Sequence, residues 1–512
     1  MGAYEGIEHV VVLMLENRSF DSMFGKLYPK SAAFEGLSGK ETNPWHRPDG
    51  TVVDMPVWND EGMDPVSASI PDPDPGELFK EDMDVQLFGL GGTPGTEPPS
   101  MSGFIDNYMR QPPSDPHSDP MAVMHHFTPK QVPIISALAK AFGISDQWHA
   151  SAPCQTWPNR FFAHTATAGG YVNNMPTHFP YVMPTIFKRL QEHGRSWRLY
   201  FHDLPQAATL ADIWLEAPFH FRCFTDEFEE DCRSGRLANY SFIEPRYFTD
   251  SIKGLVPNDQ HPPHDVIYGE QLIAQVYNAV RRAPTWKKTL LVITYDEHGG
   301  CYDHMPPPLA VPPEARTGSD GFAFDRYGVR VPAVIISPYM PPGSIVRSAP
   351  AGLPHQGPPY PFDHASIVST LRKLFDLGAP LTARDAAAPD LLGTLSLNEP
   401  TNDGPERIDA QPVRPTPEKV AKRAAAPANN MQHSLCAMAA HLPPQAAVAG
   451  AHISALSSGA LIPQPVTLTS TESALNPAID RFQSLLATGS AVDGAANAPQ
   501  ASPGETTGKP VP

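Results

Sequence analysis

The run from Leu291 to Gly300, LVITYDEHGG, constrains the fold more than any other stretch of the chain. Apolar and β-branched residues are followed by two acids, a histidine and a Gly-Gly pair. This pattern is typical of a buried strand that delivers polar side chains at its carboxyl end and then turns. Open α/β sheets bind their ligands at that end of the strands. Taken alone, the acidic end is explained equally well as a solvated turn.

A second stretch near the amino terminus has the same form. Residues 9–15, HVVVLML, predict another apolar strand, and Glu16 to Asp21 follow it directly. Two strand ends that carry oxygen ligands indicate one metal site between them, with Glu16, Asp296 and Glu297 holding the cation. Oxygen ligands suit Ca, Mg, Mn or Zn to different degrees, so the pattern predicts one divalent ion without identifying it.

Strands and helices alternate along the middle of the chain. The patterns predict strands at 143–148, 197–201, 240–243 and 331–336, and helices at 128–142, 184–193, 266–280 and 367–375. Such alternation favours an α/β fold with a mainly parallel sheet covered by helices on both faces. Thr128 and Pro129 are expected to be the cap and first residue of the 128–142 helix.

Two regions depart from this alternation. Residues 26–120 have little periodicity and many Pro, Asp and Gly residues, so we expect a long loop insertion without a core. Residues 401–512 are rich in Ala, Pro, Gln, Ser and Thr, which predicts a largely disordered tail after a catalytic domain of residues 1–400. One stripe in the tail, Met431, Leu435, Met438 and Leu442, has helical spacing and could dock on the body.

Charge and composition exclude several classes of partner. The formal charge of −18 on 512 residues would repel a nucleic acid backbone. No window of some twenty apolar residues exists for a transmembrane helix, although peripheral contact with a lipid surface stays open. No charged leader precedes the first strand, which favours a cytoplasmic protein over a secreted form whose leader has been removed. The five cysteines give no disulfide framework, and a Cys223–Cys232 pair is the less favoured alternative.

Thr156 is the candidate nucleophile. It lies in the run Gln155-Thr156-Trp157-Pro158-Asn159-Arg160, where Pro158 indicates the start of a helix. The N–H groups at a helix N-terminus favour a phosphate. A threonine hydroxyl needs activation by a base or a metal ion. The alternative is that Thr156 only caps the helix.

Other polar residues are candidates for phosphate binding. Arg160 lies one helical turn after Thr156 and could grip a phosphate oxygen, and Asn159 could be a further donor. His261 and His264 flank two prolines and could bind phosphate or protonate a leaving oxygen; the alternative is an ordinary surface loop. Asp303 and His304 follow the Gly-Gly turn closely enough to join the site. Asp363-His364 is interpreted as a helix cap.

Four of these motifs together resemble the phosphoesterase family, which contains bacterial phospholipases C, related acid phosphatases and plant non-specific phospholipases C. The motifs begin at Glu16, Thr156, Asn258 and Thr294, and they occur in the family's order between about residues 5 and 395. The resemblance implies an alkaline-phosphatase-like α/β fold and metal-assisted hydrolysis of a phospholipid or small phosphoester.

The resemblance also implies roles for individual residues. Glu16 and Asn17 match metal-site residues, and Asp296 and Glu297 match the acidic metal pair. Thr156 matches the nucleophile, which would pass through a phosphothreonine intermediate. His261 and His298 match histidines near the phosphate. The chain has Glu77 where many relatives have a histidine after Asp-Pro-Gly, which puts a substrate contact at that place in doubt.

Three other functions compete with phospholipase C activity. An acid phosphatase acting on phosphomonoesters would use the same residues. A sulfatase has its Cys or Ser nucleophile at the spacing of Thr156, but threonine cannot form the sulfatase aldehyde and Cys154 is two residues out of register. A non-catalytic anion-binding protein could use the metal site to hold its ligand.

Overall fold

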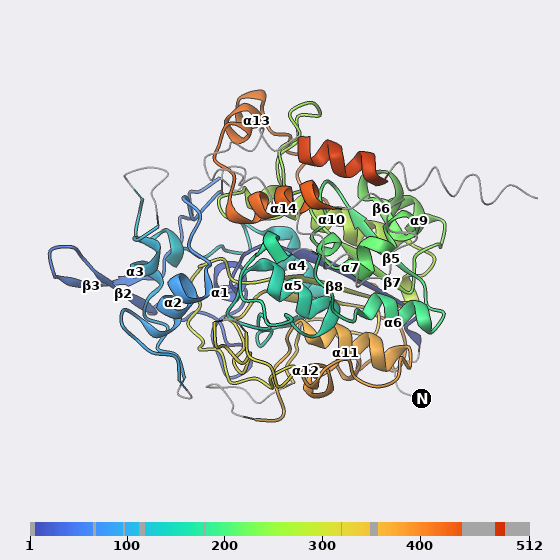
Figure 1. Ribbon diagram of the computed structural model, residues 1–512, viewed down its shortest axis with the longest axis horizontal. Coiled ribbons are helices and arrows are strands. Elements are labelled where there is room, and N and C mark those ends of the chain that lie inside the picture. Colours follow the sequence, from blue (N-terminus) through green and yellow to red (C-terminus); the bar gives the residue numbers. More distant parts are fainter. Residues whose placement is uncertain are drawn as a thin grey trace, which may run out of the picture.

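The computed structural model has an eight-stranded sheet at its centre (Figure 1). It describes residues 6–64, 68–95, 98–111, 118–178, 180–318, 320–348, 357–442 and 477–486. The strands lie in the order β10, β4, β9, β8, β1, β7, β5, β6. Their bounds are β1 His9–Leu15, β4 Gly143–Ser145, β5 Trp197–Phe201, β6 Phe221–Cys223, β7 Tyr240–Ile243, β8 Thr289–Tyr295, β9 Ala333–Ile336 and β10 Ser344–Ile345.

The sheet is mainly parallel, as predicted. β1 runs parallel to both β7 and β8, and β5 runs parallel to β6 and β7. Among the described strands of this sheet, only β9 runs antiparallel to its neighbours, β8 and β4. All seven side chains of β8 and six of the seven of β1 are buried, which requires cover on both faces of the sheet.

Two groups of helices provide this cover. One contains α4 (Pro133–Ala141), α9 (Glu229–Arg233) and α10 (Val266–Arg282), in which α10 contacts the other two as well as β1 and β8. The other contains α5 (Thr156–Thr165), α6 (Ile186–Glu192) and α11 (Ala365–Leu374), which pack against one another. The shorter helices are α1 Phe20–Phe24, α7 Ala211–Leu215, α8 Ala217–His220 and α12 Ala383–Ala387.

Two predicted boundaries are wrong. Helix α4 begins at Pro133 with Val132 as its cap, not at Thr128. Proline has no N–H and therefore fits the first turn of a helix but not its interior. A helix that started at Thr128 would place Pro133 in its interior. The strand predicted at 143–148 ends at Ser145, and Trp148 then forms an isolated bridge to Phe362.

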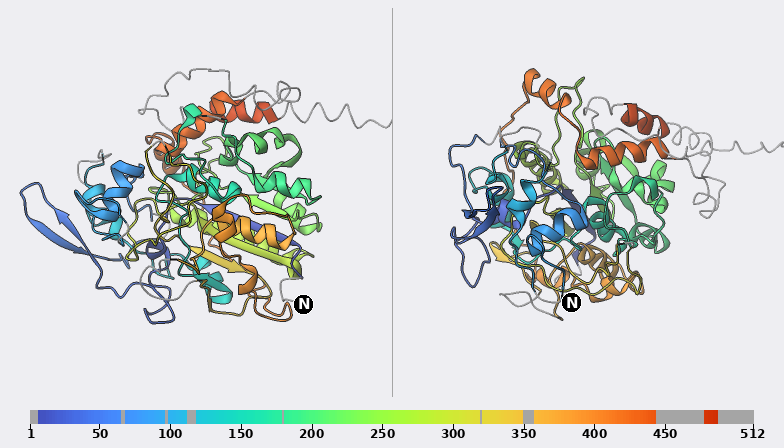
Figure 2. Two further views of the ribbon diagram at one scale, coloured as in Figure 1. Left: turned by 60° about the horizontal axis from the view of Figure 1, so that its bottom comes forward. Right: turned by 60° about the vertical axis from the view of Figure 1, so that its left-hand side comes forward.

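The insertion has a core of its own, contrary to the prediction. The hairpin of β2 (Thr42–His46) and β3 (Val52–Pro56) projects from the body (Figure 2), and helices α2 (Asp84–Phe88) and α3 (Phe104–Tyr108) pack beneath it. Leu87, Phe104 and Ile105 belong to a separate buried cluster. The apolar residues of this cluster are spread over a long stretch, so no periodicity reveals them.

The beginning of the tail is ordered and packed. Residues 401–442 include α13 (Pro417–Ala424) and α14 (Asn430–His441), so the prediction of disorder is wrong for this part. The predicted docking stripe is confirmed, because Met431, Leu435, Met438 and Leu442 are all fully buried in the main core. Residues 477–486 form a further helix, from which Phe482 packs against Trp214. The remainder of the tail lies outside the described residues.

This packing predicts that the tail stabilises the body. Replacing Leu435 by alanine should lower the free energy of unfolding by about 2–5 kcal/mol, because it deletes buried methyl groups from the main core. Urea denaturation followed by circular dichroism measures the change, with the exposed Ala421→Gly on α13 as a control for helix propensity. An unchanged midpoint for Leu435→Ala would mean that α14 does not contribute to the core.

Two sequence predictions concern cysteines and membrane spans. All five cysteines are free thiols, so Cys223 and Cys232 do not pair. Among the described residues, none of the helices combines the length and the apolar character that crossing a bilayer requires.

Candidate active site

The register of the two central strands brings the two acidic strand ends together. Leu15 of β1 pairs with Tyr295 of β8, so the next residues, Glu16 and Asp296, lie side by side. The Asp296 backbone N–H donates to the Leu15 carbonyl at 3.2 Å. Both carboxylates are fully buried. The sequence prediction that these two ends meet is therefore confirmed.

Asn17 connects both strand ends to the insertion. Its backbone N–H donates to Asp296 Oδ1 at 2.9 Å, and its side-chain Nδ2 donates to Glu297 Oε1 at 2.7 Å and to Glu77 Oε1 at 2.5 Å. Asn17 has a φ of 52°, a left-handed conformation that asparagine tolerates better than most residues. At Gly299 an added Cβ would lie 2.5 Å from the Asn17 carbonyl oxygen, which explains the glycine after the acidic pair.

Thr156 lies beside Glu16 and Asn17. It is the first residue of α5, with Gln155 as the cap, so the alternative that Thr156 is the capping residue is wrong. Its Oγ1 lies 3.4 Å from Glu16 Oε2 and 3.5 Å from Asn17 Oδ1. The helix start therefore presents a hydroxyl to the oxygen-rich end of the sheet.

Arg160 is one turn further along α5 and is also fully buried. It donates to Glu16 Oε1 and, at 3.1 Å, to the Met14 carbonyl oxygen. Its guanidinium lies 3.8 Å from Glu244 and 3.9 Å from Asp296. Burial lowers the pKa of Arg160, but the neighbouring carboxylates, Glu16 foremost, raise it by more. The side chain therefore stays charged. Arg160 is thus directed to Glu16, and a grip on phosphate stays a prediction.

The oxygen atoms around Thr156 suit a divalent cation. Burial is the main cause that raises the pKa of Glu16, Glu77 and Glu297, and nearby acids such as Asp296 raise it further. Asp296 Oδ2 is buried and has no hydrogen-bond partner among the described residues. Glu16 Oε2, Asn17 Oδ1 and Asp296 Oδ2 are hard oxygen donors of the kind that Ca, Mg and Mn prefer. The residues present therefore fit a bound metal ion.

His261 faces the same cluster from the other side. Ligand atoms of Asp74, Glu77 and His261 lie within 4.8 Å of one another. His261 Nδ1 lies 2.6 Å from its acceptor, the Pro262 carbonyl, which leaves the lone pair on Nε2. This Nε2 is buried, has no hydrogen-bond partner among the described residues and lies 3.5 Å from Glu77 Oε1. Burial lowers the pKa of His261 to about 3, so the ring is neutral and its Nε2 lone pair can bind a metal.

His264 forms a pair with Asp259 that sequence reasoning did not identify. His264 Nδ1 lies 2.6 Å from Asp259 Oδ1, and the other ring nitrogen, Nε2, is buried without a partner among the described residues. A carboxylate that fixes one nitrogen of an imidazole leaves the second ready to act as a general base. The spacing of Asp259 within the loop that also contains His261 and His264 could have revealed it.

Three predicted phosphate contacts have other partners. Asn159 uses its side-chain amide on the loop before Thr156, with bonds to the carbonyls of Ala152 and Cys154 and from the Ala152 N–H, so it holds that loop rather than facing the site. His298 is buried, with its Nε2 2.8 Å from Gln86 Oε1 and its Nδ1 3.2 Å from Glu297 Oε2. It orients Glu297, and its contact with phosphate stays a prediction.

His304 belongs to a different cluster, contrary to the prediction. Its Nδ1 bonds Asp21 at 2.6 Å, and Arg330 bridges Asp21 and Asp303 at 3.0 Å. This network ties the loop after β8 to α1. No interaction among the described residues links His304 to Thr156.

Several site residues were missed. Glu77, considered doubtful from sequence, is buried against Asn17. His364 is the N-cap residue of α11, as predicted, but its side chain makes no capping bond, and its Nε2 lies 2.6 Å from the Asp296 carbonyl oxygen. Gln206 Nε2 donates to Glu16 Oε1 at 2.8 Å, and Glu244 follows β7 as Glu16 follows β1. The last position was readable, because an acid follows a predicted strand there.

Comparisons with known proteins show which family the chain is similar to. The Phosphoesterase family profile matches residues 7–378. Non-specific phospholipase C1 of Arabidopsis thaliana is 37% identical over 411 residues, covering 78% of this chain and 73% of its own. Non-specific phospholipase C6 of the same plant is 38% identical, covering 81% and 77%. Phospholipase C B of Mycobacterium tuberculosis is 27% identical, covering 80% and 81%.

Solved structures give weaker matches. A protein of the alkaline phosphatase superfamily from Vibrio parahaemolyticus is 12% identical with a TM-score of 0.30, covering 51% of this chain and 63% of its own. The lipoteichoic acid synthase LtaP from Listeria monocytogenes is 15% identical with a TM-score of 0.32, covering 51% and 69%. Scores of this size support no argument about the fold, whose α/β class is given by the sheet itself.

Proposed function

Because the chain belongs to the Phosphoesterase family and hydrolyses phosphoric esters, we propose that it is a phospholipase C, which cleaves a phospholipid between glycerol and phosphate. The observation that carries the proposal is the Thr156 hydroxyl, held at a helix start within 3.5 Å of Glu16 and Asn17 oxygens. The names of the relatives, both plant and mycobacterial, support a phospholipid as the substrate.

In the first step, Thr156 Oγ1 forms a bond to phosphorus while the bond from phosphorus to the leaving oxygen breaks. The threonine proton passes through water in the site to the leaving oxygen, and Glu16, whose Oε2 lies 3.4 Å from the hydroxyl, stays ionised. Neutral His261 cannot supply the proton that the leaving oxygen takes, because its Nε2 carries none. The product is a phosphothreonine and a free diacylglycerol.

In the second step, water attacks the phosphothreonine and restores the hydroxyl. We assign the water proton first to His264 Nε2, because Asp259 fixes its other nitrogen, and then through water to Thr156 Oγ1, which regains its hydroxyl. Arg160 keeps Glu16 oriented and charge-balanced throughout. Each step is an exchange of one bond at phosphorus, which helix N–H groups and positive charge assist.

One divalent metal ion would be held by Glu16, Asn17 and Asp296. Glu297 would support Asn17 by accepting a hydrogen bond from the Asn17 side-chain amide. When bound, such an ion neutralises charge on the phosphate oxygens and favours the deprotonated nucleophile. Ca, Mg, Mn and Zn all remain candidates. Contact with a lipid surface and a cytoplasmic location stay predictions.

An acid phosphatase is the second candidate, because the same residues serve a monoester. The test compares turnover of p-nitrophenyl phosphorylcholine and p-nitrophenyl phosphate, each with and without added divalent metal, followed by a phosphatidylcholine panel. We expect faster metal-dependent turnover of the diester and release of diacylglycerol from the lipid. Turnover of the monoester alone would contradict the proposal in favour of a phosphatase.

A further inference from the structure

A cavity of about 590 Å³ lies between the beginning of the tail and the loops of the site. One wall is formed by Asp72, Pro73 and Asp74 of the insertion and by Pro263 of the histidine loop. The opposite wall is α13 with the turn that follows it, including Lys422 and Arg423. A volume of this size is typical of a small-molecule site.

The cavity reaches the chemistry through Asp74. This residue lines the cavity, and its Oδ1 lies 3.6 Å from Nδ1 of His261. Pro263 lies between the two histidines, His261 and His264, whose free nitrogens are buried. Thr156 itself has no exposed surface, so an ester needs a path to it, and this cavity adjoins the loop that holds both histidines.

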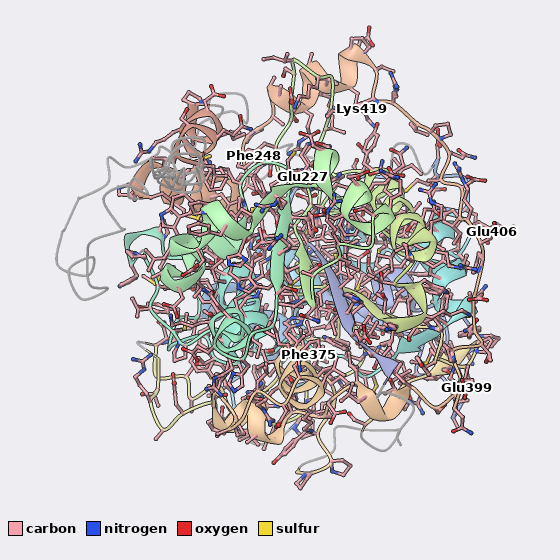
Figure 3. The ribbon with its side chains drawn as sticks, turned by 90° about the vertical axis from the view of Figure 1, so that its right-hand side faces the viewer. Glu227, Phe248, Phe375, Glu399, Glu406 and Lys419 are labelled. Carbon is pink, nitrogen blue, oxygen red and sulfur yellow. The ribbon has the colours of Figure 1, made fainter. Side chains whose placement is uncertain are left out.

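Helix α13 is attached to the body by few contacts. Val420 packs on Val256, Ile267 and Tyr268 in a small cluster separate from the main core. Lys419 bonds Asp265 at 2.9 Å and lies over the Tyr268 ring. Figures 1 and 3 show the helix standing outside the body, with Lys419 near the edge of the molecule. The helix thus forms an outer wall and not part of the core.

The charges of α13 complement an anion. The protein carries a net charge of −18, and the residues around Thr156 are mostly acids. Arg160 is bound to Glu16, and Arg18 donates to the carbonyl oxygens of Gln260 and Ile70. Burial raises the pKa of Asp74 and of Asp259, and the charge of Arg423 opposes this in both, so its field reaches the site. Positive charge at a site mouth attracts anionic substrates.

We propose that the cavity walled by α13 is the access route and outer binding subsite for the anionic phosphoester, with Lys422 and Arg423 as residues that determine its affinity. This inference rests on the proposed function and extends it to a segment beyond the matched family region, which ends at residue 378. The substrate phosphate passes these two side chains before it reaches Thr156, and the group esterified to the phosphate occupies the cavity.

The test uses the full chain with both residues replaced by glutamine, Lys422→Gln with Arg423→Gln. The KM for bis(p-nitrophenyl) phosphate, a diester with a net negative charge, should rise about tenfold at low salt with kcat unchanged, because only attraction and outer binding are lost. Added salt should raise the wild-type KM toward that of the variant, since screening removes the same attraction. The exchange Lys422→Arg with Arg423→Lys keeps both charges and should retain the wild-type KM. Lys188→Gln, an exposed lysine on α6, is the control for charge removal elsewhere.

An unchanged KM in the glutamine pair, or an equal rise in KM in the charge-preserving exchange, would overturn the inference. These outcomes are separate from the proposed function. If the enzyme turns over only the monoester, the same comparison of variants is made with the KM for p-nitrophenyl phosphate. If neither ester is turned over, calorimetric titration with inorganic phosphate gives the answer: weaker binding in the glutamine pair supports the role of α13, and equal binding contradicts it.

Discussion

Replacing Thr156 by alanine should lower kcat for phosphoester hydrolysis by at least about 10³-fold, and up to the 10⁶-fold seen when activated nucleophiles are removed. The hydroxyl is the attacking group, and alanine leaves no atom to accept the phosphoryl group. Thr156→Ser should keep much of the turnover because it retains the hydroxyl. Initial rates with p-nitrophenyl phosphorylcholine measure the effect.

A control for the fold comes from the same helix. Thr165 is the last residue of α5 and is equally buried, but its Oγ1 bonds the Phe161 and Thr167 carbonyls away from the acids. Thr165→Ala should therefore retain turnover within a few fold. Near-normal turnover in Thr156→Ala would instead leave water as the attacking group.

Replacing Asp296 by asparagine should remove most bound metal and lower turnover by more than about 100-fold, because residues that merely support metal ligands already contribute 10–100-fold. The substitution keeps the shape of the side chain but removes the negative charge of the carboxylate. The Oδ2 atom of this carboxylate has no hydrogen-bond partner among the described residues. Elemental analysis of the purified protein measures occupancy. Glu16→Gln should lower it as well.

A buried acid outside the site controls for this result. Glu270 is fully buried and accepts the backbone N–H groups of Ile134 and Ile135, and burial raises its pKa to about 8. It is protonated at pH 7, so Glu270→Gln should keep both metal and activity. Unchanged occupancy in Asp296→Asn would exclude Asp296 as a ligand.

The sequence was sufficient for the centre of the fold and for the acids at its strand ends. The two runs ending at Leu15 and Tyr295 have strand length and consist mostly of apolar and β-branched residues, which predicts buried strands, and parallel strands end at the same edge. The meeting of Glu16 and Asp296 follows from that rule. The helix after Thr156 was predicted because Pro158 fits only a first turn.

The residues that approach from distant segments could not be predicted in the same way. Glu77 reaches Asn17 from an insertion whose apolar residues have no period, and Asn159 bonds the carbonyls of its own loop. The docking of α14 was readable from four spaced apolar residues, whereas α13 has only Val420 and Ala424 buried and shows no such stripe. Long-range packing, not local pattern, decided these cases.

The most direct test of Thr156 as the nucleophile is to trap the covalent intermediate. Brief incubation with a substrate labelled in the phosphate, followed by acid quench and trypsin, should place the label on the peptide of residues 141–160, which ends at Arg160. The label should be on Thr156 and absent from the Thr156→Ala protein. Label on another residue of that peptide, or none during steady turnover, would contradict hydrolysis through phosphothreonine.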